Sequence, residues 1–212
     1  MSEEAELRQE LVRMGRLLST RQLAHGTAGN LSVKLGDGNI LVTPTNSSLG
    51  DLDADRISKV SRAGDLISGD KPSKEYFFHL AVFDERPGAR AVVHLHSTYS
   101  VAVSCLRHEQ TDDVLPSLTA YYVMRVGKLP LVPYFPPGDR ALAEEVRSVS
   151  REHRSMLLAN HGPIVSGASL SDAVSAYEEL EETAKISFIL GDRPTSPLNA
   201  EHVANLNRAF PT

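Results

Sequence analysis

The chain has 212 residues, of which 41% are hydrophobic and 23% charged, and its formal net charge at pH 7 is −5. This length is enough for one sizeable core and short for two, which predicts a single domain over residues 1–212. No lysine-rich or arginine-rich run is present, which argues against a nucleic-acid partner. No apolar run approaches the roughly 18–20 residues that a membrane helix needs. The acidic start and the single cysteine, Cys105, predict a cytoplasmic protein.

The first part of the chain shows helical spacing and then strand alternation. Apolar residues at helical spacing predict an amphipathic helix over 7–19. Alternating apolar residues over 31–35, a glycine-rich turn and a second apolar run over 40–42 predict a β-hairpin. A further short strand pair is predicted between residues 60 and 67. These elements indicate antiparallel pairing early in the chain.

The rest of the chain alternates helices with strands. In chain order we expect a helix over 74–85 capped by Ser73, a buried strand over 91–93, a proline-interrupted strand over 129–135, a helix over 140–150, a strand over 156–158 and a helix over 171–190, followed by a weakly patterned tail. The interleaving predicts one α/β domain with a mixed, mostly antiparallel central sheet.

A histidine pair follows the predicted strand over 91–93. His94 and His96 are two residues apart, so on a strand their side chains point to the same face and can converge on one ion. Neutral imidazole is the commonest nitrogen ligand of zinc and similar metals. The alternative is two hydrogen-bonded polar residues near a strand end. His161 favours the metal, because it also stands at a strand end beside a turn that can direct it.

A carboxylate stands near the start of the helix predicted over 74–85. Glu75 can act there as a general acid or base beside a metal, or it can simply interact favourably with the helix dipole. His79 lies one helical turn further and can pair with Glu75 or ligate the same ion. From this segment alone the dipole interpretation is favoured.

Several polar residues stand at the ends of neighbouring predicted elements. They supply amides, hydroxyls, backbone N–H groups and one cation, and such a set can surround a phosphate. The residues concerned are Asn30, Thr45, Asn46, Ser73 and Lys74. The alternative is that each fills an ordinary turn.

Two tyrosines and the cysteine are weaker candidates. Either Tyr121 or Tyr122 can donate a proton, although such a pair more often packs in a core. Cys105 is expected to be a small core residue rather than a nucleophile.

Five ordered motifs together resemble the class II aldolase/adducin family. They are His25-Gly26-Thr27-Ala28-Gly29-Asn30-Leu31-Ser32, Leu41-Val42-Thr43-Pro44-Thr45, Lys71-Pro72-Ser73-Lys74-Glu75, Val92-Val93-His94-Leu95-His96-Ser97 and Leu158-Ala159-Asn160-His161-Gly162. The resemblance covers nearly the whole chain, from about Leu7 to about Leu190. It implies an α/β/α sandwich and a homotetramer with active sites at subunit interfaces.

The resemblance also implies roles for single residues. His94, His96 and His161 would bind a divalent metal ion, usually zinc, and Glu75 would be the acid/base and a metal ligand in the absence of substrate. The phosphate would lie where the fuculose-phosphate aldolase type binds it, and the residues at those positions are Asn30, Thr45, Asn46, Ser73 and Lys74.

Two departures from that aldolase type bear on the substrate. The aldolase type has glycine at the position of Asn46 and a second serine at the position of Lys74. The segments 45–50 and 73–75, which contain these departures, and the segment 120–130 resemble a narrower branch, the 3-oxo-tetronate 4-phosphate decarboxylases. In that branch a tyrosine is the proton donor, which we assign to Tyr121, with Tyr122 as the alternative.

The branch implies a metal-dependent decarboxylation. Carbon dioxide leaves 3-oxo-tetronate 4-phosphate, a phosphorylated four-carbon sugar acid, and the remaining enediolate is protonated to dihydroxyacetone phosphate. A class II sugar-phosphate aldolase or epimerase is the second hypothesis. A non-catalytic, adducin-like interaction module is the third, and the open three-histidine site beside Glu75 favours an enzyme over it.

Overall fold

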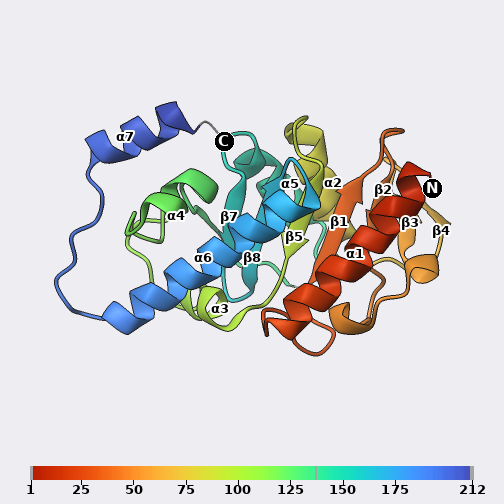
Figure 1. Ribbon diagram of the computed structural model, residues 1–212, viewed down its shortest axis with the longest axis horizontal. Helices are drawn as coiled ribbons and strands as arrows, with labels where there is room; N and C mark the ends of the chain where they lie inside the picture. The colour runs from red at the N-terminus through yellow and green to blue at the C-terminus, as the bar shows by residue number, and fades with distance from the viewer. Residues whose placement is uncertain (1, 137, 211–212) are drawn as a thin grey trace.

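An eight-stranded sheet lies at the centre of the computed structural model, which describes residues 2–136 and 138–210 (Figure 1). Its strands are β1 (Asn30–Lys34), β2 (Ile40–Val42), β3 (Ser58–Val60), β4 (Leu66–Ser68), β5 (Ala91–His94), β6 (Leu131–Val132), β7 (Ser155–Leu158) and β8 (Gly162–Gly167). Their order across the sheet is β4-β3-β2-β1-β5-β8-β7-β6. Every pairing is antiparallel except that of β6 with β7. The prediction of a mixed, mostly antiparallel sheet is confirmed.

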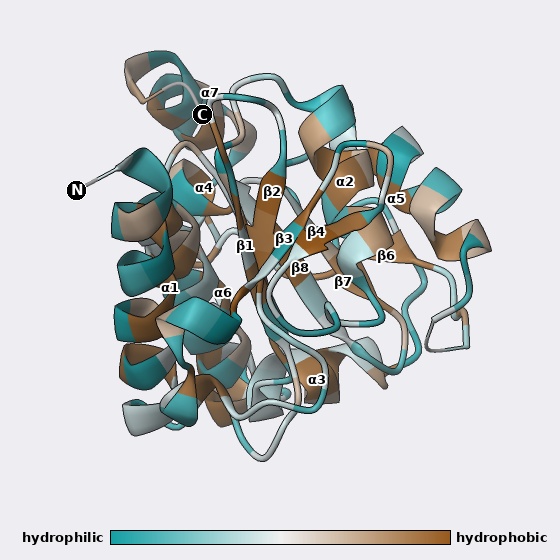
Figure 2. Cartoon of the chain, turned by 90° about the vertical axis from the view of Figure 1, so that its right-hand side faces the viewer, coloured by the Kyte–Doolittle hydropathy of each residue, from teal (hydrophilic) through white to brown (hydrophobic). Residues whose placement is uncertain are grey.

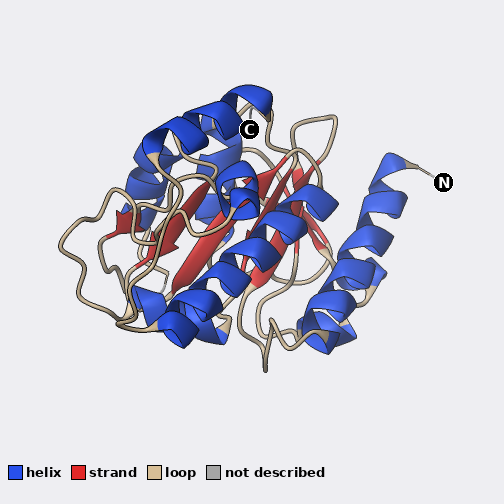
Figure 3. Ribbon diagram, turned by 60° about the vertical axis from the view of Figure 1, so that its left-hand side comes forward, coloured by secondary structure: helices blue, strands red, loops and turns tan. Residues whose placement is uncertain are grey.

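Helices cover both faces of the sheet. They are α1 (Glu3–Thr20), α2 (Tyr76–Glu85), α3 (Thr98–Ser104), α4 (Ala120–Arg125), α5 (Ala141–Ser150), α6 (Leu170–Leu190) and α7 (Ala200–Ala209). One core contains buried side chains of α1, α3, α4 and α6, and the other contains those of α2 and α5. Figure 1 shows α1 and α6, from opposite ends of the chain, side by side over one face, and Figure 3 shows the sheet between its helical layers. This arrangement is the expected α/β/α sandwich.

Successive side chains of a central strand point alternately into the two hydrophobic cores. Val92 packs on the side of α2 and α5, whereas Val93 packs on the side of α1 and α6. Figure 2 shows the hydrophobic strands enclosed by helices whose outer surfaces are hydrophilic. Burial of each such side chain contributes about 1.5–3 kcal/mol. The same alternation turns His94 toward α2, where its ring lies 5.3 Å from that of Phe78.

Two predicted boundaries are wrong, each for a backbone reason. The strand expected over 129–135 shrinks to β6, because Pro130 and Pro133 on either side lack an N–H for the ladder. The helix expected from Lys74 begins at Tyr76. The N–H of Ser73 bonds to the carbonyl of Thr43, which holds the preceding segment extended against the end of β2.

Several elements were not predicted from the sequence. They are β8 and the helices α3, α4 and α7. The expectation that Cys105 is a core residue is also wrong, since it is exposed at the end of α3. Within the described residues, no helix combines the length and apolar character needed to cross a bilayer.

Asp113 offers a test of buried charge in the fold. Burial is the main cause that raises the pKa of this carboxyl above its ordinary value, although the N–H of Leu129 donates to Oδ1 at 3.1 Å. A raised pKa in the folded state means that stability is present below the unfolded pKa and is lost as pH rises through the folded one. We expect Asp113→Asn, which keeps the acceptor, to raise Tm at pH 7 by roughly 1–2 °C.

Thermal melts at pH 7 and at pH 4 check this expectation. The gain is expected to shrink at pH 4, because a raised pKa lets the wild-type carboxyl take up its proton more readily as pH falls. Asp192→Asn, at an exposed position after α6, is the matched control and should not change Tm. A lower Tm for Asp113→Asn at pH 7 would contradict the argument.

Candidate metal centre and active site

Three neighbouring strands bring the candidate residues to one end of the sheet. Asn30 at the start of β1 lies opposite His94 at the end of β5, and His94 lies opposite Ile164 of β8. His161 stands immediately before β8, and His96 follows β5 by two residues. The sheet register therefore gathers residues that are up to 131 positions apart, from Asn30 to His161.

The three histidines and Glu75 point ligand atoms at one another. These four atoms all lie within 4.8 Å of one another. Nε2 of His94 is 3.0 Å from Nε2 of His96 and 3.6 Å from Oε2 of Glu75, and Nε2 of His161 is 3.3 Å from Oε1 of Glu75. A tetrahedral zinc ion bound at about 2.0–2.1 Å sets its ligand atoms about 3.3–3.4 Å apart. The observed spacings of 3.0–3.6 Å bracket this value, so the four residues could hold a divalent metal ion.

The imidazoles of the cluster are held neutral. Burial is the main cause that lowers the pKa of all three rings, to about 4 for His96 and well below the ordinary value for His94. Charge on neighbouring histidines adds to the effect at His94 and His96, whereas Glu75 opposes it at His161. The neutral ring is the form that ligates a metal, so the site is prepared for one.

Tight backbone packing aims two of the rings. Asn160 adopts a φ of +55°, and the N–H of His161 donates to Oγ of Ser104 at 3.2 Å. A Cβ on Gly162 would stand 2.5 Å from the carbonyl oxygen of Leu95, so only glycine allows this approach. Nδ1 of His94 donates to the carbonyl of Pro163 at 3.0 Å, which leaves Nε2 free for a metal. The structure thus supplies the turn that the sequence indicated beside His161.

A hydrogen-bond chain fixes Glu75 from behind. Nδ2 of Asn30 donates to Oε2 of Glu75 at 2.8 Å, and Oδ1 of Asn30 is 2.5 Å from Nε2 of His79. Nδ1 of His79 is 2.7 Å from Oγ of Ser32. Because Oδ1 can only accept, the His79 proton lies on Nε2 and Ser32 donates to Nδ1. Asn30 therefore stands between Glu75 and His79, so the direct pairing that their spacing allowed is not present.

A hollow of about 160 Å³ opens beside the cluster. Its lining includes Glu75 and His96 together with all five residues predicted for phosphate binding, which are Asn30, Thr45, Asn46, Ser73 and Lys74. Asn46 adopts a φ of +57°, a region that glycine and asparagine tolerate best. Thr27 and Gly138 also line the hollow, and sequence patterns alone did not mark them as site residues.

The two candidate tyrosines lie in opposite environments on α4. Tyr121 is 60% exposed, whereas Tyr122 is fully buried and its hydroxyl has no hydrogen-bond partner among the described residues. Burial raises the pKa of Tyr122 far above its ordinary value. Neither tyrosine lines the hollow beside Glu75 within one chain.

A family profile decides the relationship of the chain. The profile of the class II aldolase and adducin N-terminal domain matches residues 9–188. The chain belongs to the class II aldolase and adducin family. The match covers both helical layers of the sandwich and every residue of the candidate metal centre.

Individual members of the class II aldolase and adducin family are also similar over nearly the whole chain. A 3-oxo-tetronate 4-phosphate decarboxylase of Pectobacterium atrosepticum is 51% identical, over 98% of this chain and 95% of its own. The solved structure of YgbL from Escherichia coli, for which aldolase, epimerase and decarboxylase are named as alternatives, superposes with a TM-score of 0.94 at 50% identity, covering 97% and 99% of the two chains. An L-fuculose 1-phosphate aldolase superposes with a TM-score of 0.90 at 26% identity, covering 100% and 98%.

His79 provides a test of the chain behind Glu75. His79→Phe keeps an aromatic ring of similar size but removes the donor to Asn30, so the Asn30 amide and Glu75 lose their fixed orientation. We expect kcat to fall about 10–100-fold with a smaller change in KM, as for other groups that orient ligands and bases. Kinetics of the metal-loaded protein measure this split.

Rescue by a conservative variant separates positioning from bulk. His79→Gln retains a donor for Asn30 and is expected to recover much of the lost kcat. If His79→Phe and His79→Gln lose activity equally, and in proportion to lost stability, His79 only fills space.

Proposed function

We propose that the chain decarboxylates 3-oxo-tetronate 4-phosphate to dihydroxyacetone phosphate and carbon dioxide. The observation that carries the proposal is the meeting of His96 and Glu75 with the phosphate-type residues in one hollow. The decarboxylase named among the relatives, at 51% identity, supports this choice. In the reaction, the bond between the carboxylate carbon and its neighbour breaks and its electron pair passes into an enediolate. A proton then adds to the carbon that carried the carboxylate, which gives dihydroxyacetone phosphate.

We propose that His94, His96 and His161 hold the divalent metal, with zinc the ion that their donor set favours. Three neutral imidazoles whose ligand atoms lie within 4.8 Å of one another suit zinc and would leave a position open for substrate. A bound metal ion supplies Lewis-acid stabilisation of negative charge on a substrate oxygen. No base is needed to break the bond to the carboxylate. Glu75, next to the open position, is therefore assigned to accept and return a proton of the substrate hydroxyl.

The phosphate end of the substrate is assigned to the opposite part of the hollow. Asn30, Thr45, Asn46, Ser73 and Lys74 supply neutral donors and one cation there. Lys74 is exposed and has no carboxylate within 4.0 Å among the described residues, so its charge is available to a ligand. This chemistry favours a phosphorylated substrate over a neutral sugar.

Tyr121 is assigned as the proton donor and is contributed by a neighbouring copy in a homotetramer. Its 60% exposure makes it available to another subunit, whereas Tyr122 is enclosed in the core. Residues 1–212 are taken as one domain, because both clusters of buried hydrophobic residues pack on a single sheet. A cytoplasmic location is part of the same proposal, since the exposed free thiol of Cys105 suits a reducing compartment.

Lys74 tests the phosphate assignment. Lys74→Met removes the charge and keeps most of the side-chain length, so we expect KM for the phosphorylated substrate to rise about 10-fold with kcat nearly unchanged. Lys185→Met on α6, which removes an exposed lysine elsewhere, is the matched control. An unchanged KM in Lys74→Met would contradict the assignment.

Substrate choice is tested with two compounds. The metal-loaded protein is incubated with 3-oxo-tetronate 4-phosphate, and release of carbon dioxide and dihydroxyacetone phosphate is followed over time. Parallel incubations contain fuculose 1-phosphate. The proposal expects carbon dioxide from the first compound. Cleavage of fuculose 1-phosphate without carbon dioxide from 3-oxo-tetronate 4-phosphate would instead establish the sugar-phosphate aldolase alternative. The similarity to an aldolase structure at 26% identity is the reason for retaining that second candidate.

A further inference from the structure

A second cavity lies at the end of the sheet opposite the candidate metal centre. β5 runs from Ala91 to His94, and Ala91 lies opposite Gly167, where β8 ends. Ala89 and Gly167 line the cavity, whereas His94 and His161 stand at the other ends of the same strands. The length of β5 therefore separates the two sites by roughly 10 Å. The cavity measures about 530 Å³, which is within the usual range of about 300–1,000 Å³ for small-molecule sites.

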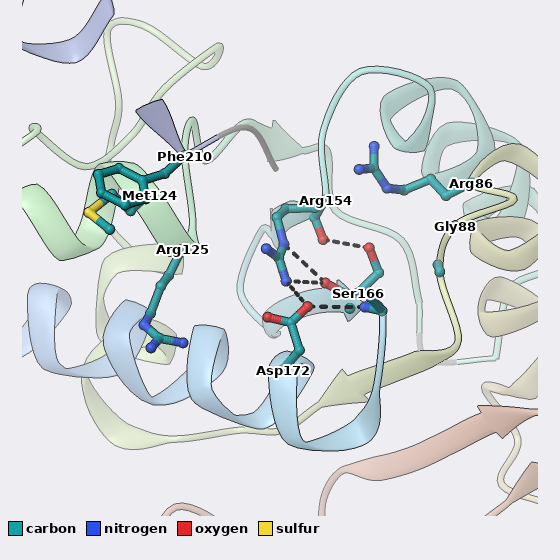
Figure 4. Close-up of a pocket in the computed structure, with 11 residues that line it drawn as sticks. Arg86, Gly88, Met124, Arg125, Arg154, Ser166, Asp172 and Phe210 are labelled. Carbon is teal, nitrogen blue, oxygen red and sulfur yellow. Dashed lines mark hydrogen bonds and ion pairs between the residues drawn. The ribbon is translucent and has the colours of Figure 1, made fainter. Parts of the chain in front are cut away.

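Three arginines from separate parts of the fold line this cavity (Figure 4). Arg86 follows α2, Arg125 ends α4 and Arg154 precedes β7. Asp172, in the first turn of α6, is the one acidic residue in the lining. The lining therefore carries a net charge of about +2 near pH 7, since each arginine is protonated.

Asp172 compensates only Arg154. Nη2 of Arg154 donates to Oδ2 of Asp172 at 2.8 Å and to the carbonyl of Ser166 at 3.0 Å, and its Nε also donates to that carbonyl. The N–H of Ala168 shares the same carboxylate oxygen at 3.0 Å. Arg154 is therefore fixed in the floor of the cavity, and its Nη1 has no bond to another described residue.

Arg86 and Arg125 carry uncompensated charge. Nη1 of Arg86 donates to the carbonyl of Ser150 at 3.2 Å, and neither arginine has a carboxylate within 4.0 Å among the described residues. Burial and the charge of Arg154 both lower the pKa of the half-buried Arg86. The half-buried guanidinium of Arg86 is thus exposed to the positive charge of Arg154, and an anion between these two side chains would offset that cost.

The remaining walls favour an organic ligand over a simple ion. Met124 and Phe210 form an apolar wall on the side of Arg125, across the cavity from Arg86 (Figure 4). Gly88 stands on the side of Arg86, and a Cβ there would meet nothing within 4 Å, so the cavity is open at that point. A ligand can extend from one cationic end to the other along this wall.

We propose that this cavity binds a small phosphorylated carboxylic acid, with its phosphate between Arg86 and Arg154 and its carboxylate toward Arg125. Planar guanidinium groups match phosphate and carboxylate through paired hydrogen bonds, which explains the use of arginine at all three positions. The site is independent of the metal and of the catalytic hollow, because it shares no lining residue with them. Its occupation does not depend on the proposed decarboxylase activity.

Calorimetric titration of the full-length, metal-loaded protein tests the proposal. All variants carry Lys74→Met to weaken binding in the catalytic hollow, and the probes are 3-phosphoglycerate, glycerol 3-phosphate and inorganic phosphate at constant ionic strength. We expect Arg86→Gln to weaken the binding of 3-phosphoglycerate at least 10-fold. Arg125→Gln is expected to weaken the binding of 3-phosphoglycerate. It should leave the affinity for glycerol 3-phosphate, which lacks the carboxylate, unchanged.

Two controls make the result decisive. Arg13→Gln removes an exposed arginine of α1 and should not change any of these affinities. Arg86→Lys preserves the positive charge but not the planar guanidinium group. It should therefore bind 3-phosphoglycerate more weakly than the parent and more tightly than Arg86→Gln. If Arg86→Gln does not fold, Arg86→Lys and Arg125→Gln still carry the test.

Two outcomes would overturn the proposal. One is binding of 3-phosphoglycerate that is unchanged by the arginine substitutions. The other is dissociation of an assembly in the Arg86→Gln variant, measured by sedimentation velocity, without any loss of phosphate binding. That second outcome would make the cavity a contact between copies of the chain.

Discussion

Replacing His94 by alanine is expected to remove bound metal and to lower kcat/KM by about 1,000-fold or more. His94 is fully buried at the end of β5, and its Nε2 faces both His96 and Glu75. Without His94 the candidate metal centre loses one of its three imidazoles, so its affinity for zinc is expected to fall. Metal content by mass spectrometry and carbon dioxide release measure the two effects together.

A second histidine substitution provides the control. His202→Ala removes an exposed histidine in the first turn of α7 and should leave metal content and activity unchanged. A His94→Ala protein that keeps a stoichiometric metal ion and full activity would end the metal-dependent interpretations. Because Phe78 packs against His94, circular dichroism must show that the variant is folded.

Glu75→Gln is expected to lower kcat about 100-fold while the metal stays bound. The amide oxygen of glutamine can still accept the hydrogen bond that Nδ2 of Asn30 donates at 2.8 Å, so the local geometry is preserved. The variant loses the ability to take up and return a proton, and general acid–base groups of this kind contribute about 10²–10⁴-fold to the reaction rate. The three histidines that we propose as metal ligands remain in this variant.

Metal content separates the two roles of Glu75. Glu85→Gln, at the other end of α2, removes a carboxylate that pairs with Arg147 and Arg151 and is the matched control. Retained metal with low kcat indicates a proton-handling group. Loss of metal in proportion to activity would show that Glu75 acts mainly as a ligand, and unchanged kcat would remove it from the mechanism.

The buried chain behind Glu75 explains how a flexible carboxylate is held beside three histidines. Ser32 and Asn30 lie on the same side of β1, so both face His79 of α2. Burial lowers the pKa of His79 to about 3, and the ring therefore stays neutral across the working range of pH. A neutral ring keeps one donor and one acceptor, which is what this chain of hydrogen bonds requires.

The amino-acid sequence by itself determined the features that depend on local order. Strand alternation predicted that His94 and His96 share one side; β5 ends at His94, yet the two rings lie 4.9 Å apart. The turn after β7 placed His161 at the adjacent strand end. The hydrophobic spacing predicted α1, α5 and α6 to within a few residues and the antiparallel character of the sheet. Local periodicity suffices for these features, because each depends on neighbours in the chain.

Only the tertiary structure decided which residues far apart in sequence meet. The hydrogen bond between Ser73 and Thr43 accompanies the later start of α2, just before which Glu75 faces the candidate metal centre, and no local pattern encodes that bond. The short helices α3 and α4 depend on packing against α6 rather than on propensity, since isolated helices of this length are unstable. The arginine cavity likewise unites the ends of α2 and α4 with the start of β7. Long-range packing brings these residues together, so local sequence patterns could not predict these contacts.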